Sequence, residues 1–540
     1  MNRRVWIYDT TLRDGSQGEG VSFSLEDKLK IVQCLDEFGV DYVEGGWPSS
    51  NPKDTAFFEH VRALPLAHAR VSAFGSTRHR ASPAAKDANL SALLAARTPV
   101  VTIFGKTWLL HVTEILGCTP QENLALIRES VAHLKQAGRE VVFDAEHFFD
   151  GYRDNPSYAL EALGAAREGG ADVLALCDTN GGTLPETLRR IVAEAVAAFG
   201  ACVGIHVHND SGVAVANSLV AVEAGAVQVQ GTFNGMGERC GNADLVAVIP
   251  NLLLKMDCEL GVTREALGGL THTARYVSAI ANHHFPENSP FVGARAFAHK
   301  GGVHVNSVLK QSRTYEHVPP ESVGNDRRFL VSELAGKSNI QHLARHEGID
   351  LGTSDEVPRA VIAEIKRLEH EGYQFEGAEA SAALIIKRVL GQVPVAFELV
   401  GFRVIVERRA RDRTTYSEAT VKVRVDGREE LSVGEGNGPV AALDAALRAA
   451  LRQFYPEVAT VRLTDYRVRV VDEDRGTAAR VRVVIESADE DGAWSTVGVS
   501  ENIIEASWLA LIDSIIYGLI RHGAIDRFND NKEPGSQKVD

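Results

Sequence analysis

The chain has 540 residues, with 57 basic and 72 acidic side chains and therefore a formal net charge of −15 at pH 7. Hydrophobic residues make up 44% of the chain and charged residues 24%, which is ordinary for a soluble globular protein. The excess of negative charge argues against binding to nucleic acid or to an anionic membrane surface. The length is sufficient for a large barrel and at least one further domain.

The cysteines and the N-terminal residues indicate where the protein is found. The six cysteines form no CxxC pair, so neither a zinc cage nor a disulfide framework is expected. They are Cys34, Cys118, Cys177, Cys202, Cys240 and Cys258. The opening stretch MNRRVWIYDTTLRDG contains no apolar signal-peptide core. No uninterrupted apolar run reaches the roughly 18 residues of a transmembrane helix. We therefore expect a cytoplasmic protein with reduced thiols.

Short β-branched runs alternate with amphipathic stretches over the first half of the chain. The expected strands are residues 5–9, 40–46, 71–75, 100–105, 141–146, 173–178, 203–208 and 227–233. Eight strand–helix units over about 260 residues predict a closed parallel (β/α)8 TIM barrel at 1–275, hence an α/β fold. An open doubly wound sheet is the alternative. Such a sheet normally has a glycine-rich turn after its first strand, where this chain has TTLRDGSQ.

The second half of the chain follows two further patterns. Residues 276–395 contain expected helices and loops broken by Pro and Gly, which predicts helical linker subdomains. Residues 396–528 contain a repeat of two alternating strands, a polar turn and an apolar helix. The two copies begin ATVKVRVDGREELSVGEG and ARVRVVIESADEDGAWST. A duplicated β-β-α unit predicts a pseudo-symmetric α+β domain. The polar tail at 529–540 is expected to be disordered.

A pair of histidines in GIHVHNDSG follows the seventh expected strand, at the rim where a barrel carries its chemistry. Side chains at positions i and i+2 of a strand point to the same side, so His206 and His208 can face one ion. Asp14, in a loop at the same rim, can add a carboxylate oxygen. Such ligands suit Mn, Fe, Zn or Mg. Two hydrogen-bonded histidines without a metal are the alternative.

Three charged residues at the same rim are candidates for catalysis or substrate binding. Arg13 stays charged and can stabilise negative charge that develops on a substrate oxygen, although a surface ion pair with its neighbour Asp14 is the alternative. Glu44 and Glu146 each end a strand, where either can orient a substrate, bind a metal-bound water or move protons. A structural role in the loop backbone is equally compatible with Glu44.

Two candidates come from glycine-containing segments further along the chain. Asn242, in GMGERCGNADL, offers a neutral oxygen to a cation, and the glycines of this segment permit tight turns. His299, in HKGGVH, lies beyond the expected barrel and can close over its rim as a base with a pKa near neutrality. A histidine so far along the chain is, however, more often structural.

Two long motifs resemble the signatures of the isopropylmalate synthase and homocitrate synthase family. LRDGSQGEGVSFSLEDK, from Leu12 to Lys28, matches the first signature, which is L-R-[D/E]-G-x-Q, ten residues and then K. VGIHVHNDSGVAVA matches the second signature, and GMGERCGNADL and FAHKGGVH match further family blocks. The resemblance covers the chain to about residue 528. It likens the duplicated C-terminal unit to the allosteric and dimerisation domain of the family.

The resemblance implies a role for each candidate residue. The implied ligands of a divalent metal (Mn, Mg, Zn or Co) are Asp14, His206, His208 and Asn242. Arg13 would steady the carbonyl oxygen of a keto acid as it becomes an alkoxide. Glu146 would lie near the acetyl group or a metal-bound water, and Thr179 would contact the substrate. His299 matches the proposed base of the family, and Tyr315 matches a tyrosine that reaches the active site from the partner subunit.

Within the family, DAEHFFDGY, ANHHFPENSPFVG and LVSELAGKSNI are most similar to the branch that uses pyruvate. The implied reaction condenses acetyl-CoA, a co-substrate, with pyruvate and water to give 2-methylmalate and CoA. The product would enter isoleucine biosynthesis. The family also implies a homodimer and feedback by a branched-chain amino acid, with isoleucine expected here.

Three alternatives remain open at this point. The same machinery can use another keto acid, 2-ketoisovalerate or 2-ketoglutarate, because one methylene in an apolar pocket is worth only about 1–3 kcal/mol. A metal-dependent lyase shares the barrel and the histidine pair, and would use a reactive cysteine at the position of Cys240. A non-catalytic amino-acid sensor would have lost some of the rim residues, which are all present here.

Overall fold

The structure is a computed structural model that describes residues 3–48, 50–332, 334–408, 415–472, 476 and 478–528. It divides into two compact units, each of which is described by itself. The first unit is Met1–Phe297 with His317–Arg327, and the second is Ala298–Glu316 with Arg328–Asp540. The predicted disorder of the tail at 529–540 concerns residues outside those described. The expected domain boundaries after residues 275, 395 and 528 stay predictions.

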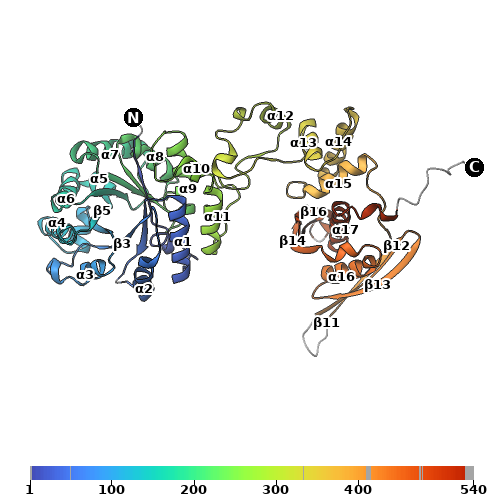
Figure 1. Ribbon diagram of the computed structural model, residues 1–540, viewed down its shortest axis with the longest axis horizontal. Helices are drawn as coiled ribbons and strands as arrows, with labels where there is room; N and C mark the ends of the chain where they lie inside the picture. Colours follow the sequence, from blue (N-terminus) through green and yellow to red (C-terminus); the bar gives the residue numbers. More distant parts are fainter. Residues whose placement is uncertain are drawn as a thin grey trace, which may run out of the picture. The chain divides into compact units, whose positions relative to one another are not determined.

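Eight parallel strands of the first unit close into a barrel in chain order (Figure 1). They are β1 (Trp6–Asp9), β2 (Tyr42–Gly46), β3 (Arg70–Ser76), β4 (Val100–Lys106), β5 (Glu140–Glu146), β6 (Val173–Asp178), β7 (Val203–Val207) and β8 (Gln228–Gly231). β1 pairs with β8, which closes the ring. The predicted TIM barrel is confirmed, and each expected strand overlaps an observed one.

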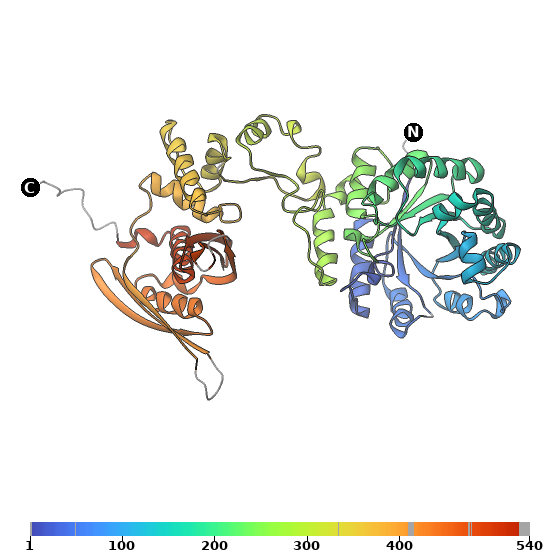
Figure 2. The same cartoon turned by 180° about the vertical axis from the view of Figure 1, so that it is seen from behind.

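Helices follow the strands and surround the barrel (Figures 1 and 2). They are α1 (Leu25–Phe38), α2 (Pro52–His60), α3 (Ala88–Ala95), α4 (Pro120–Gln136), α5 (Phe148–Asp154), α6 (Pro156–Gly169), α7 (Pro185–Phe199), α8 (Ala214–Ala224), α9 (Leu245–Leu254), α10 (Arg264–Leu267) and α11 (Leu270–Ile280). The sequence fixes several helix ends locally. Ser24 begins α1 with a capping box that includes Asp27, and Gly39 ends it with a left-handed φ of 95°.

Polar side chains are buried inside the barrel as well as apolar ones. They lie on seven of the eight strands and are all below a tenth exposed: Tyr8, Glu44, Ser72, Thr102, Asp144, His206, Gln228 and Gln230. Buried polar groups need hydrogen-bond partners to offset the loss of water. Neighbouring inward-facing positions supply them. The interior therefore contains series of hydrogen-bonded side chains that extend to the residues at the carboxyl ends of the strands.

The second unit contains a short sheet and helices, followed by two similar sheet–helix arrangements. The first part comprises β9 (Ala298–His299), β10 (Arg328–Phe329), α12 (Gly302–Lys310), α13 (Lys337–His346), α14 (Glu356–His370) and α15 (Glu379–Val389). One arrangement is β11 (Glu398–Arg408), β12 (Thr415–Val425), β13 (Arg428–Gly436) and α16 (Pro439–Arg452). The other is β14 (Arg462–Val470), β15 (Val481–Asp489), β16 (Gly492–Ser500) and α17 (Ile503–Arg521).

The predicted duplication is confirmed, but each copy has one more strand than the sequence indicated. The repeat is β-β-β-α, with β11 and β14 each pairing antiparallel to the next strand. Both extra strands lie at a sheet edge and are mostly exposed. Their charged residues mask the apolar alternation that marks a half-buried strand.

Helix α17 is long and apolar enough to cross a membrane by length and composition, the one such helix among the described residues. It also forms part of the core of the second unit, where Ala506, Trp508, Leu511 and Ile515 are buried. A buried core helix passes the same test, so this helix alone is weak evidence for a membrane span.

Lys28 of α1 carries a buried charge that joins three elements of the barrel. Its ammonium group donates to the Gly45 carbonyl oxygen of β2 at 2.9 Å and to Asp54 Oδ1 of α2 at 2.5 Å. Asp54 also accepts a hydrogen bond of 3.0 Å from the Trp47 N–H. The Lys28 side chain is 2% exposed and that of Asp54 is 9% exposed. Water therefore screens this pair very little.

Replacing Lys28 with Met leaves Asp54 buried without its counter-charge. We expect Lys28→Met to lower the free energy of unfolding of the barrel by about 3–5 kcal/mol, measured by urea unfolding. Lys30→Met is the matched control, because Lys30 pairs with Glu26 on the exposed face of the same helix. It should change the free energy by less than about 1 kcal/mol. Equal losses in the two variants would show that the buried pair is not what joins these elements.

Candidate active site

A pocket of about 280 Å³ opens at the carboxyl ends of the barrel strands. The structure brings six of the residues predicted from the sequence together in its lining: Arg13, Asp14, Glu146, Thr179, His206 and His208. They come from segments up to nearly 200 residues apart in the chain. Barrel closure alone places them together, as expected for the catalytic rim of this fold.

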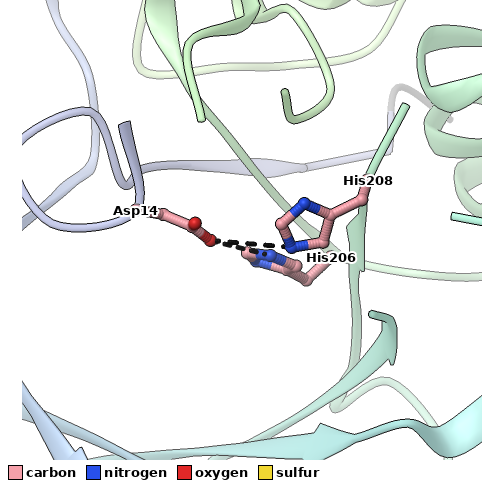
Figure 3. Close-up of side chains that lie close together, drawn as sticks. All are labelled: Asp14, His206 and His208. Carbon is pink, nitrogen blue, oxygen red and sulfur yellow. Dashed lines mark ion pairs between the residues drawn. The ribbon is translucent and has the colours of Figure 1, made fainter. Parts of the chain in front are cut away.

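Asp14, His206 and His208 form a compact cluster in this pocket (Figure 3). Asp14 Oδ2 lies 3.2 Å from His206 Nε2 and 3.9 Å from His208 Nε2. One ligand atom from each residue lies within 4.8 Å of the others, and all three side chains are buried. His206 lies on β7 and His208 follows it two residues later, so both rings face the same side, as the strand period predicts.

Asn242 completes a donor set that fits a divalent cation. It lies beside His208, with which it forms an isolated antiparallel bridge. Its amide nitrogen donates to the Met236 carbonyl oxygen at 3.1 Å, while its Oδ1 is buried without a hydrogen-bond partner. An unpaired buried oxygen is costly unless a ligand satisfies it. Two imidazoles, a carboxylate and an amide oxygen are a set that divalent metals accept.

Local charges and hydrogen bonds set the protonation of Asp14 and of the two histidines. Burial alone would raise the pKa of Asp14, but the charge of Arg13 and the hydrogen bond with His206 hold it well below its usual range. Burial would lower the pKa of His206, and the hydrogen bond with Asp14 raises it above normal. Burial and the neighbouring His206 lower the pKa of His208 to about 4. Asp14 is thus ionised and His208 neutral at pH 7, ready to bind a cation.

Arg13 is held in place from behind by Glu44. Arg13 Nε donates to Glu44 Oε1 at 2.5 Å, and its guanidinium carbon lies 3.8 Å from the centre of the Phe74 ring. The other carboxylate oxygen, Glu44 Oε2, accepts a 2.7 Å hydrogen bond from the Tyr8 hydroxyl. Glu44 is fully buried. The structure places it behind Arg13, and its expected contact with substrate stays a prediction.

Glu146 and Thr179 each have one defined partner at the rim. Glu146 forms an ion pair with Lys106 at the end of β4, a residue that the sequence patterns did not single out. Thr179 Oγ1 accepts a hydrogen bond of 2.9 Å from the His147 N–H. Because Thr179 accepts this bond, its hydroxyl can donate its own proton to a ligand. His147 has a left-handed φ of 55°, a conformation that is rare outside glycine and that often occurs at functional sites.

His299 and Tyr315 lie in the second unit. His299 Nε2 lies 3.1 Å from Glu316 Oε1, and the Tyr315 ring stacks on His304 with 4.1 Å between ring centres. The Tyr315 side chain is 46% exposed. Their expected roles at the barrel stay predictions.

Three aromatic rings, here called the aromatic wall (Trp47, Phe74 and Phe104), also line the pocket. The Trp47 ring is 5.9 Å from each of the two Phe rings, which are 5.6 Å apart. Trp47 Nε1 donates to Asn89 Oδ1 at 2.9 Å, which fixes the indole. No pattern in the sequence singled out these residues. A signal was present, since Phe74 and Phe104 both come near the ends of neighbouring strands.

Three family models match consecutive parts of the chain. An HMGL-like model matches residues 4–270, a homocitrate synthase post-HMGL domain-like model matches 291–373, and a LeuA allosteric (dimerisation) domain model matches 376–519. The chain is 53% identical over 522 residues to the (R)-citramalate synthase of Aquifex aeolicus, covering 96% of this chain and 99% of that one.

Two further relatives are also similar over nearly the full chain. The (R)-citramalate synthase of Geobacter sulfurreducens is 51% identical, with 97% of this chain and 99% of that one covered. A probable 2-isopropylmalate synthase of Methanopyrus kandleri is 36% identical, with 95% and 98% covered. The rim residues and full-length similarity agree with the resemblance of the motifs. The chain belongs to the isopropylmalate synthase and homocitrate synthase family, in its citramalate synthase branch.

Proposed function

We propose that this chain is an acyltransferase that condenses acetyl-CoA with pyruvate and water to give citramalate and CoA. The observation that carries the proposal is the cluster of Asp14, His206 and His208 beside Arg13, in one pocket of a chain 53% identical to an (R)-citramalate synthase. The place of this product in isoleucine biosynthesis is part of the same proposal.

Different residues of the pocket act on different groups of the keto acid. A divalent cation held by Asp14, His206, His208 and Asn242 would supply Lewis acidity toward the oxygens of the keto acid. Arg13 donates to the carbonyl oxygen as negative charge develops there. Thr179 donates its hydroxyl proton to the carboxylate of the substrate.

His299 is proposed as the base that takes a proton from the acetyl methyl group. Glu316 accepts from one ring nitrogen, Nε2, so the neutral ring presents its lone pair at Nδ1. The methyl proton moves to Nδ1, and the resulting enolate carbon attacks the keto carbon, whose oxygen receives the electron pair and then a proton, so that the hydroxyl group forms and His299 returns to its neutral form. Water then cleaves the thioester and releases CoA as the thiol. Glu146, held by Lys106, orients this water, and Tyr315 closes the site from a partner subunit.

The aromatic wall favours a small keto acid over a branched or charged one. Three packed rings leave little room beside Arg13, and the Trp47 ring cannot swing away without losing its hydrogen bond to Asn89. The methyl group of pyruvate fits such a surface. The isopropyl group of 2-ketoisovalerate is larger, and the second carboxylate of 2-ketoglutarate would lose its hydration against the rings. This supports pyruvate.

We further propose a cytoplasmic homodimer that isoleucine inhibits through the C-terminal domain. The match to the LeuA allosteric (dimerisation) model supports both dimerisation and an effector site. Ala419 and Val421 of β12 are buried beneath α16. The residues of β12 that alternate with these two point to the opposite face of the sheet. Leu431 and Val433 of β13 pair with those alternating residues and therefore lie on that opposite face. Leu431 and Val433 are 60% and 56% exposed. An exposed apolar sheet face marks an interaction surface.

The catalytic proposal is tested by thiol release from acetyl-CoA, with pyruvate, 2-ketobutyrate, 2-ketoisovalerate and 2-ketoglutarate offered separately. We expect the highest kcat/KM with pyruvate. Stripping the metal with a chelator should abolish release, and adding Mn²⁺ should restore it, because the cluster holds the cation that activates the keto group. A preference for 2-ketoisovalerate would overturn the substrate. No release with any of the four would favour a lyase or a sensor.

The role of Arg13 predicts a loss in kcat rather than in substrate binding. Arg13→Lys keeps the charge but loses the planar set of N–H donors of the guanidinium. The value of kcat should therefore fall about 10²–10³-fold, as when one donor to a developing oxyanion is removed. Glu44→Gln keeps one acceptor for Arg13 and should lose less. Arg128→Lys, on the surface beside Glu168, is the control and should retain the parent rate. If Arg13→Lys raises KM alone, Arg13 binds substrate without stabilising the transition state.

The dimer is tested by sedimentation of the full chain. Leu431→Glu places a charge on the exposed sheet face and should shift the protein toward the monomer, with loss of inhibition by isoleucine. Val395→Glu, at a side chain that is 72% exposed and outside the sheets, is the control and should remain dimeric. A dimer that survives Leu431→Glu unchanged would exclude this face as the interface.

A further inference from the structure

His206 is held from inside the barrel by Gln230 of the neighbouring strand. β7 and β8 are in register such that His206 and Gln230 are direct partners. The distance from His206 Nδ1 to Gln230 Oε1 is 2.9 Å. Gln230 is completely buried, so this contact has no competition from water.

The other end of the Gln230 amide is fixed from across the barrel. Gln230 Nε2 donates to Asp144 Oδ1 of β5 at 2.9 Å, and it also lies 3.3 Å from Gln228 Oε1. Asp144 is 3% exposed. Because the amide nitrogen faces these two oxygens, the amide oxygen must face His206. Asp144 therefore determines which end of Gln230 the histidine meets.

We propose that Asp144 and Gln230 are positioning residues that select the tautomer of His206 required for metal binding. An amide oxygen can only accept, so His206 keeps a proton on Nδ1 and leaves Nε2, the atom that faces Asp14, as the one that gives up its proton to bind a cation. If Gln230 were turned over, its NH₂ group would require the lone pair at Nδ1. The proton would then occupy Nε2, the atom that faces the cluster, and would block ligation.

The identity of residue 230 suits this task electrostatically. A carboxylate bonded directly to His206 would orient the ring equally well, but it would bring a second negative charge close to Asp14 and Glu44. The neutral amide orients His206 without adding a negative charge beside Asp14. Groups that orient a metal-binding histidine in this way typically change metal affinity or activity 10–100-fold when they are lost. The inference rests on the metal site of the proposed function.

Binding of Mn²⁺ to metal-stripped protein, followed by the EPR signal of the free ion, tests the inference without an activity assay. Gln230→Met and Asp144→Leu should each weaken Mn²⁺ binding about 10–100-fold. Asp144→Asn keeps an oxygen that accepts from Gln230 and should recover most of the affinity. Ser218→Ala is the control. The buried Ser218 hydroxyl on α8 donates to the Ala214 carbonyl oxygen and not to a residue of the cluster. Parent-like affinity in both Gln230→Met and Asp144→Leu would overturn the proposal.

A second measurement reads the protonation of the parent protein itself. In metal-free parent protein with ¹⁵N-labelled histidine, His206 should keep a proton on Nδ1, whether or not Nε2 also donates one to Asp14. Its signal is assigned by its absence in His206→Asn. An Nδ1 without a proton would refute the proposal. If the parent neither binds Mn²⁺ nor releases thiol, the proposed function fails, while the position of the proton still decides the role of Gln230 and Asp144.

Discussion

The site depends on keeping the carboxylate of Asp14 ionised in a buried position. Burial raises its pKa, and the guanidinium of Arg13 and the imidazoles of His206 and His208 outweigh this effect. Each of those groups is in turn fixed by a buried partner, Glu44 for Arg13 and Gln230 for His206. A buried charge is tolerated only when paired and hydrogen-bonded. The pocket therefore requires the polar interior of the barrel as well as its rim.

Because of this requirement, the side chains on the two faces of each strand have different roles. The helix-facing side chains are apolar and supply the core, while inward-facing ones near the carboxyl ends form hydrogen-bonded chains that end at reactive groups. The buried charges of the cluster also oppose folding, because each has to leave water. Local couplings such as that between Lys28 and Asp54, which join the helical shell to the strands, help to offset this cost.

The sequence predicted the parts of this arrangement that depend on short periods. The strands were visible as β-branched runs, and the period of two placed His206 and His208 on one side. Contacts between strands that are distant in sequence could not be read in this way. The pairing of Lys106 with Glu146, the place of Glu44 behind Arg13 and the bridge from Asp144 to His206 exist only once the ring closes. The edge strands β11 and β14 were missed because their exposed charges hide the alternation.

The division into two units assigns the chemistry to different parts of the chain. The cation ligands and Arg13 all belong to the barrel, whereas His299 belongs to the unit that also contains the duplicated C-terminal repeat. Under the proposed mechanism, residues of the first unit activate the keto group and a residue of the second unit takes the acetyl proton. A ligand that alters the second unit can then stop proton removal while the metal cluster stays intact. In that arrangement inhibition lowers kcat and leaves metal affinity unchanged, which distinguishes it from competition at the pocket.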